Sequence, residues 1–315
     1  MSEPSMSCRV CDEAATHRVG TYVLCSRHFE LATRERPHVW RTQLVAIAIL
    51  VGLVVVASLL SALEGSALTG PALLVVGLVI AFVPAAVWLT LFYREDRVEP
   101  EPRHLVVGVA VLGGLLAAAV GVPFLDDVLQ PGRWAGSNVL VQLAANILGV
   151  GLVPAALVYA AVRFSVYGSG EFDEATDGVI YGTAAGLGYA TYQNVGVILD
   201  AGGASLTFGS IFVVLTALTL AGTGGLVGWF MSGQKLRGKP AWWTAAGVAL
   251  GAVVLGLYTS IRAMVIGSMV SVAGFLVGPW IGLVLAILLA GGVSYLLTRT
   301  IRRDIVAATA QEVAS

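Results

Sequence analysis

The chain has 315 residues, of which 57% are hydrophobic and only 12% are charged, and its formal net charge is -1. An average soluble domain has about 25% charged residues, so this composition excludes an ordinary soluble globular protein. It predicts an all-α polytopic membrane protein whose main partner is the lipid bilayer. A net charge near zero gives no indication of nucleic-acid binding.

The first 41 residues form the soluble part of the chain and hold four possible metal ligands, Cys8, Cys11, Cys25 and His28. A CxxC pair and a CxxH pair, separated by thirteen residues, suit a tetrahedral zinc site. Residues 20–24 have the composition of a strand. We therefore predict a small zinc-ribbon-like module (residues 1–41) with one structural zinc. Unliganded thiols are the alternative, and His17 could replace His28.

Eight apolar runs are long enough to cross a bilayer, which takes about 20 residues each. They cover residues 43–63, 72–92, 104–122, 139–164, 178–199, 206–231, 241–258 and 275–297. Residues 260–274 are apolar enough to lie in the membrane interface or to re-enter the membrane. These runs predict a helical membrane domain over residues 42–303, followed by a short tail at 304–315.

Basic residues predict the orientation of these spans. Counted on alternate sides, one side holds Arg133 and Arg262, and the other holds the remaining 16 of the 18 lysines and arginines. Cytoplasmic loops are enriched in such residues, so both termini should face the cytoplasm of a multi-pass cell-membrane protein. The first forty residues lack the apolar core of a cleavable signal sequence.

A charged loop at residues 92–105 carries Glu99 and Glu101 within the tetrapeptide EPEP. Its prolines hold the chain extended and prevent a helix from continuing across it. The charge pattern alone favours an ordinary solvated hairpin over a functional loop. The next acidic cluster, at 171–177, ends at Asp177, where an apolar helix begins.

That apolar helix carries small residues at every fourth position, followed by an amide: Gly178, Gly182, Gly186, Ala190 and Asn194. This spacing places them on one helical face. Small residues let a second helix approach closely, and close packing is what drives helices together in lipid. We therefore expect this helix in the interior of the bundle.

Five amides are predicted to reach the same outer depth of the membrane, namely Asn138, Gln142, Asn146, Gln193 and Asn194. Polar side chains in lipid are costly unless they have partners, so these amides should face the bundle interior. They could line a cavity for a substrate or a partner. Alternatively, they could hydrogen-bond to each other and hold the helices together.

Two of these stretches together resemble the PrsW family of intramembrane peptidases. The first motif matches at Tyr93, Asp96, Glu99, Pro100, Glu101 and Pro102, and the second at Phe172, Asp173, Glu174, Asp177, Gly178, Tyr181, Gly182, Gly186, Gly188 and Asn194. The resemblance covers roughly residues 81–231. It implies a prokaryotic protein that cleaves membrane-anchored regulators within or near the membrane, by a mechanism similar to that of CaaX-type proteases. The amino-terminal module is not part of the family pattern.

The chain departs from that pattern at the expected catalytic groups. The family's Glu-Glu pair is replaced by the stretch VPAALVY at 153–159, the Glu of its Glu-Asn pair is Gln193, and no histidine follows His104. Amides neither ionise nor act as ordinary general bases, so no intramembrane metal is predicted. The sequence favours a non-proteolytic relative that binds membrane segments or partners. The alternatives are an active peptidase that uses Glu99, Glu101 and Asp177, and a small-solute transporter, for which no buried ionisable residue marks a coupling site.

Overall fold

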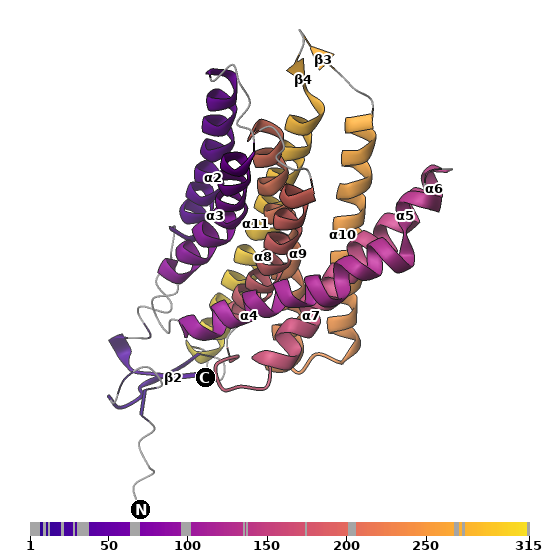
Figure 1. Cartoon of the computed structure of the whole chain (residues 1–315). Helices are drawn as coiled ribbons and strands as arrows, with labels where there is room; N and C mark the ends of the chain where they lie inside the picture. The colour runs from indigo at the N-terminus through magenta and orange to yellow at the C-terminus, as the bar shows by residue number, and fades with distance from the viewer. Residues whose placement is uncertain are drawn as a thin grey trace, which may run out of the picture.

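The fold was analysed in a computed structural model of the chain (Figure 1). The structure describes residues 7–8, 11, 13–19, 22–27, 29, 38–63, 70–95, 102–134, 136, 138–173, 175–200, 206–267, 271–272 and 275–313. The side chains of 301–313 and of several residues at other helix ends are not described.

Eight long helical segments follow one another in the described part of the chain. They are α2 (His38–Leu63), α3 (Pro71–Glu95), a segment from α4 (Arg103–Leu116) to α5 (Pro131–Trp134), a segment from α6 (Val139–Ala145) to α7 (Leu152–Ser165), α8 (Ala175–Asp200), α9 (Leu206–Leu236), α10 (Trp242–Gly267) and α11 (Gly278–Val313). Seven of these are long and apolar enough to cross a membrane. The eighth, α8, has 26 residues but is rich in glycine and polar residues. The predicted all-α polytopic fold is confirmed.

Two helix ends and one connection differ from the sequence-based expectation. The third span continues through the π-helices η1 (Ala117–Gly121) and η2 (Phe124–Leu129) to Trp134, where we expected an external loop. The seventh, α10, continues to Gly267, so most of the segment expected to lie in or re-enter the interface is helical. A two-stranded hairpin, β3 (Ser271–Val272) and β4 (Phe275–Leu276), then connects it to α11. Apolar composition cannot locate these ends, because a helix can continue beyond the apolar core.

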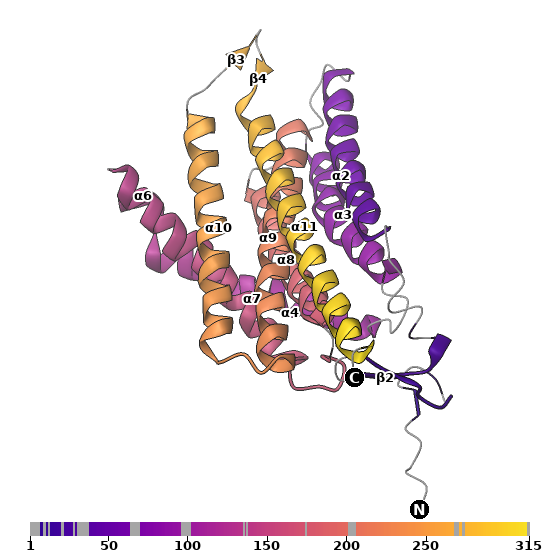
Figure 2. The same cartoon turned by 180° about the vertical axis from the view of Figure 1, so that it is seen from behind.

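Helix α9 lies at the centre of the bundle (Figures 1 and 2). Of the apolar window of α9, 83% is buried, against 22–50% in the other six apolar spans. Helices α2, α3, α8, α10 and α11 all contact α9. Because α9 has no broad lipid-facing side, the packing of its neighbours determines which of its residues can be substituted.

The contact between α8 and α9 is the most extensive in the fold. The two helices are antiparallel, and their small residues meet in register: Gly178 with Gly228, Gly182 with Gly224 and Gly186 with Leu220. At each of these glycines of α8, an added Cβ would collide with a carbonyl oxygen of α9. The backbones can therefore approach this closely only because the side chains are missing.

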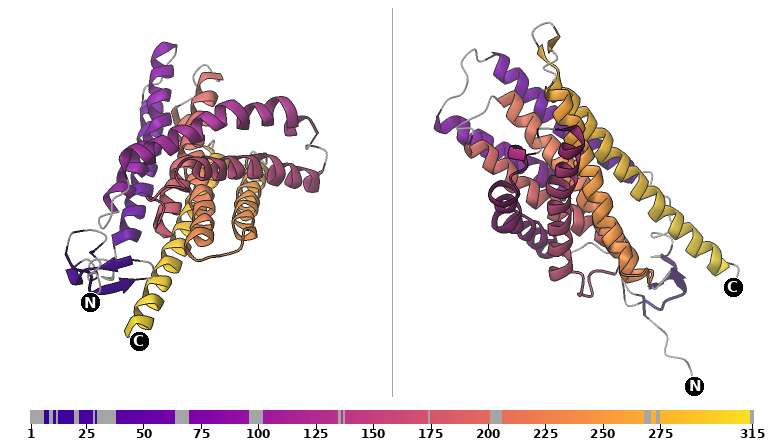
Figure 3. Two further views of the ribbon diagram at one scale, coloured as in Figure 1. Left: turned by 90° about the horizontal axis from the view of Figure 1, so that it is seen from below. Right: turned by 90° about the vertical axis from the view of Figure 1, so that its right-hand side faces the viewer.

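The segments α4–α5 and α6–α7 run obliquely across the bundle and extend beyond it as an arm (Figure 3). The α6–α7 segment contains a further π-helix, η4 (Asn146–Gly151), which packs against α10. Glycines again permit this approach, since a Cβ on Gly151 would meet the carbonyl oxygen of Ala252 and one on Gly256 would meet the backbone of Ile147.

The amino-terminal module contains an antiparallel hairpin of β1 (His17–Val19) and β2 (Tyr22–Leu24). The predicted strand at 20–24 is thus found at Tyr22–Leu24. The module lies at the same end of the bundle as the carboxyl terminus, and β1 contacts α11 (Figures 1 and 2). Helix α11 also continues through most of the segment that we expected to be a short tail.

The α8–α9 register predicts which glycines of α8 tolerate a methyl group. Gly182→Ala should destabilise the protein by about 1–3 kcal/mol, because the new Cβ overlaps the carbonyl oxygen of Gly224. Gly196→Ala is the matched control on the same helix, because nothing lies within 4 Å of its Cβ position. It should be neutral or stabilise the helix by up to about 1 kcal/mol. Thermal unfolding in detergent measures both, and equal midpoints would contradict the proposed packing.

Candidate functional sites

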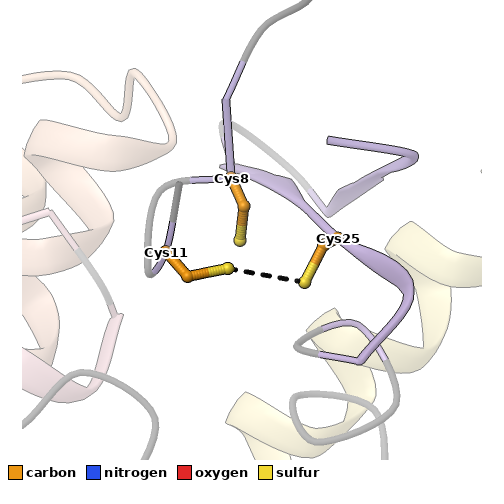
Figure 4. A group of neighbouring side chains, drawn as sticks. All are labelled: Cys8, Cys11 and Cys25. Carbon is orange, nitrogen blue, oxygen red and sulfur yellow. Dashed lines mark hydrogen bonds between the residues drawn. The ribbon is translucent and has the colours of Figure 1, made fainter. Parts of the chain in front are cut away.

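Three cysteine thiols meet beside the β1–β2 hairpin (Figure 4). Cys25 directly follows β2, and the backbone N–H of Cys8 donates to the carbonyl oxygen of Glu13 (2.7 Å), which closes the turn that carries Cys11. The three Sγ atoms lie within 4.8 Å of one another. The Sγ atoms of Cys11 and Cys25 are 3.8 Å apart, and Cys8 and Cys25 are buried.

This geometry fits a metal ion better than a disulfide. Two sulfurs in a disulfide are about 2.05 Å apart, whereas two thiolates bound to one tetrahedral zinc at about 2.3 Å lie about 3.8 Å apart. The ring of His17 stacks on Phe29, with 4.2 Å between centroids and 22° between planes, and does not join the cluster. His28 lies outside the described residues. The three cysteines are the only group of metal-binding side chains in the described part of the chain.

Asp177 lies in the first turn of α8 and is 3% exposed. Its carboxylate accepts a hydrogen bond from the backbone N–H of Asp173 (2.8 Å). It also interacts electrostatically with Lys235 at the end of α9. A carboxylate at a helix amino terminus is stabilised by the free N–H groups there. Asp177 therefore fixes the path of the chain into α8.

The other two candidate acids, Glu99 and Glu101, lie outside the described residues. The first described residue after them is Pro102, the N-cap of α4, and α4 starts at Arg103. Their catalytic candidacy therefore remains a prediction from the sequence.

The amides of the α6–η4 segment have separate roles. Asn138 caps α6 by accepting a hydrogen bond from the N–H of Leu140 (2.8 Å). Asn146 is buried at the start of η4 and donates from Nδ2 to the hydroxyl of Ser260 on α10 (2.9 Å). Gln142, which lies between them in the sequence, is half-buried. Asn146 thus connects η4 to α10.

The amides of α8 face a different neighbour. Asn194 is 1% exposed, and its Nδ2 donates to the carbonyl oxygen of Val213 on α9 (3.2 Å). Its Oδ1 is buried and has no hydrogen-bond partner among the described residues. Gln193 beside it is half-buried. The described hydrogen bonds of Asn146 and Asn194 thus go to α10 and α9.

Two buried hydroxyls were not singled out from the sequence. Tyr189 on α8 is fully buried with its hydroxyl against Gly121 of η1, and Thr223 on α9 lies beside Gly251 of α10. Neither hydroxyl has a hydrogen-bond partner among the residues that the structure describes. A tyrosine or threonine in a glycine-rich helix is common, so only the tertiary contacts distinguish these two.

Within the described helices, the buried polar side chains are almost all neutral. They are hydroxyls and amides, with Asp177 as the one buried acid: Asn146, Asp177, Thr183, Asn194, Ser210, Thr216, Thr219, Thr223, Ser232 and Thr244. Catalytic zinc sites use histidine, cysteine and carboxylate ligands. The donor set in the described bundle does not fit such a metal.

The fold and these sites define a multi-pass helical membrane protein with an amino-terminal thiol module. Residues 101–255 match the model of the PrsW family intramembrane metalloproteases. Protease PrsW of Bacillus subtilis (strain 168) is 31% identical over 112 residues, which are 36% of this chain and 49% of that protein. Protease PrsW of Geobacillus kaustophilus (strain HTA426) is 32% identical over 120 residues, 38% of this chain and 50% of that protein.

These matches confirm the resemblance drawn from the motifs: this chain is PrsW-like over residues 101–255. The matched region starts within EPEP, so it includes Glu101 but not Glu99. The chain spans about half the length of the curated relatives it matches. No solved structure matches it.

The contacts of Asp177 predict a mainly structural effect of mutation. Asp177→Ala should lower the stability by about 1.5–3 kcal/mol, because it removes a charged acceptor from the N–H of Asp173. Glu171→Gln is the matched control, because Glu171 is an exposed acid in the same cluster. Thermal unfolding in detergent compares the two variants. An Asp177→Ala variant as stable as the unaltered chain would contradict the stabilising role of this hydrogen bond.

Proposed function

We propose that this protein is a non-proteolytic PrsW-like membrane protein that binds a membrane segment of a partner. The observation that carries this proposal is the replacement of ionisable groups at the family's catalytic positions. Ala155 and Ala156 lie in the stretch where the family has its Glu-Glu pair, and Gln193 stands where it has a glutamate.

Hydrolysis of a peptide bond needs a base or a metal at the scissile carbonyl. Ala155 is fully buried, and its Cβ lies close to Gly251 of α10, where Thr223 and Val227 also converge. This part of the bundle is filled by small apolar and hydroxyl side chains. Neutral side chains of this kind do not suit a catalytic zinc, so these residues do not provide a site for metal-assisted hydrolysis.

Binding is supported by the amides of α8. The Oδ1 atom of Asn194 is a buried acceptor whose partner is missing among the described residues. An unsatisfied polar group in the hydrocarbon region costs several kcal/mol. Asn194 is 1% exposed, so the amide of this pair that a partner's membrane segment could reach is the half-buried Gln193. Hydrogen bonds between helices in membranes contribute roughly 0.6–2 kcal/mol each.

The family match favours a second candidate, an active intramembrane peptidase. Glu99, Glu101 and Asp177 are the acids of the shared motifs that remain for such an activity. Of these, Asp177 is buried and already accepts a hydrogen bond from the N–H of Asp173. This candidate therefore depends mainly on Glu99 and Glu101.

An assay in proteoliposomes separates the two candidates. The full chain should not cleave a membrane-anchored single-span protein, whereas Protease PrsW of Bacillus subtilis, assayed in parallel, tests whether that substrate can be cleaved. Cleavage by this chain that is lost in Glu99→Gln or Glu101→Gln would establish the peptidase instead.

The binding function is tested with the same single-span protein. A photo-crosslinker at position 193 should form a discrete adduct with it. A crosslinker at position 288 is the control, because Leu288 is 65% exposed on α11. Equal adducts at both positions, or none at position 193, would contradict the proposed binding site.

We also propose that the amino-terminal module holds one structural zinc and that both termini are cytoplasmic. The spacing of the three Sγ atoms supports the metal. The excess of basic residues on one side supports the orientation, because 16 of 18 lie there. A module this small cannot build an adequate core, so the metal would supply most of its stability. Thiols in the cytoplasm stay reduced and available to zinc.

Metal analysis of the purified full chain should give about one zinc per chain. Cys25→Ser should lose most of it, because a thiolate ligand is removed. His28→Ala should bind zinc less tightly, whereas His17→Ala should keep it, since the His17 ring stacks on Phe29. If His28→Ala keeps its zinc and His17→Ala loses it, the fourth ligand is His17. If the chain has reduced thiols but binds no zinc, the proposed site is refuted.

A further inference from the structure

Cations and aromatic rings alternate at the end of the bundle where α7 and α9 end and α10 begins. Arg163, Lys235, Arg237 and Lys239 each lie over an aromatic ring, at 4.7–5.8 Å from its centroid. The rings belong to Tyr167, Phe172, Trp229 and Trp243. Nothing in the proposed partner binding or zinc binding uses these residues.

Two of the cations share one ring. The guanidinium carbon of Arg163 is 4.7 Å and the Nζ atom of Lys235 is 5.5 Å from the centroid of the Tyr167 ring, so the two cationic centres lie no more than about 10 Å apart. Lys235 also donates to the carbonyl oxygen of Ser169 (3.0 Å) and lies 5.2 Å from the centroid of Phe172. These contacts hold two flexible side chains from α7 and α9 at one place.

Both cations remain accessible. Arg163 and Lys235 are exposed, and their contacts among the described residues are aromatic rings and one backbone carbonyl. Asp177 attracts Lys235 but is buried and accepts the N–H of Asp173. Burial raises the pKa of the Tyr167 hydroxyl, with Arg163 opposing that shift, so the ring stays neutral at neutral pH. The pair therefore presents two positive charges, and no accessible acid among the residues that the structure describes is in direct contact with it.

The aromatic residues near the pair indicate which kind of anion it can bind. Trp242, which is 62% exposed, and Trp243 pack edge to face at the start of α10 beside Lys239. Tryptophans and tyrosines concentrate at the boundary between membrane and water. The anions that are abundant at this boundary are phospholipid headgroups, and basic residues at helix ends attract them.

We propose that Arg163 and Lys235 form a binding site for the headgroup phosphate of one anionic phospholipid. The two non-bridging phosphate oxygens accept hydrogen bonds from the guanidinium of Arg163 and the ammonium of Lys235. Both donors lie against the ring of Tyr167, and the acyl chains follow the exposed apolar surface of α7, for example at Phe164, which is 84% exposed. The site depends on neither the proposed partner binding nor the zinc.

Native mass spectrometry of the delipidated full chain, titrated with dioleoylphosphatidylglycerol, tests the site. The double variant Arg163→Gln with Lys235→Gln should bind the first lipid at least about fivefold more weakly than the unaltered chain. Arg133→Gln with Arg262→Gln is the matched control, because it removes two cations from the opposite end. The charge-conserving variant Lys235→Arg should keep the affinity, and gel filtration verifies that each variant is folded.

Dioleoylphosphatidylcholine and inorganic phosphate distinguish the sources of the phosphate. Neither should compete for the first site, since phosphatidylcholine lacks net charge and free phosphate lacks acyl chains. The proposal is overturned if the control variant loses as much affinity as the double variant, if phosphatidylcholine binds equally well, or if inorganic phosphate alone displaces the lipid.

Discussion

The close backbone contact between α8 and α9 is the constraint on which the rest of the bundle depends. Three glycines of α8 lie against carbonyl oxygens of α9, and this pairing buries α9 along most of its length. Close packing replaces the hydrophobic effect as the force between helices in lipid. Helices α2, α3, α10 and α11 then pack around this pair, and α4 packs against α8. The missing side chains at Gly178, Gly182 and Gly186 therefore organise five further helices.

That contact also gives structural roles to residues of the second PrsW-like motif. The second PrsW-like motif comprises the entry to α8 and its glycine face, and both have structural roles here. Asp177 connects the chain before α8 to the first turn of the helix, and the glycines allow α9 to approach. The non-proteolytic function that we propose is compatible with this packing, because none of the three glycine contacts of α8 involves Ala155, Ala156 or Gln193.

The amino-terminal module and the pair of cations, Arg163 and Lys235, lie at one end of the bundle. The thiol cluster sits beside β1, which contacts α11, while Arg163 and Lys235 occupy the ends of α7 and α9 (Figures 1 and 4). The two cations are exposed, whereas Cys8 and Cys25 are buried within their own module. The bundle interior, in contrast, contains mainly neutral polar groups. Ionic chemistry in this protein thus concentrates at its rim.

The sequence by itself determined the class of protein, the order of the spans and the three cysteines that the structure brings together. These follow from composition and short-range spacing, because a bilayer requires long apolar runs and a zinc site requires paired ligands. The tertiary structure alone decided the partners of the amides, the π-helical arm and the pairing of Arg163 with Lys235 over Tyr167. Asn146 and Asn194 seemed to belong to one cavity, yet they bond to α10 and α9. Such partners depend on how helices rotate and tilt against one another, which local periodicity does not specify.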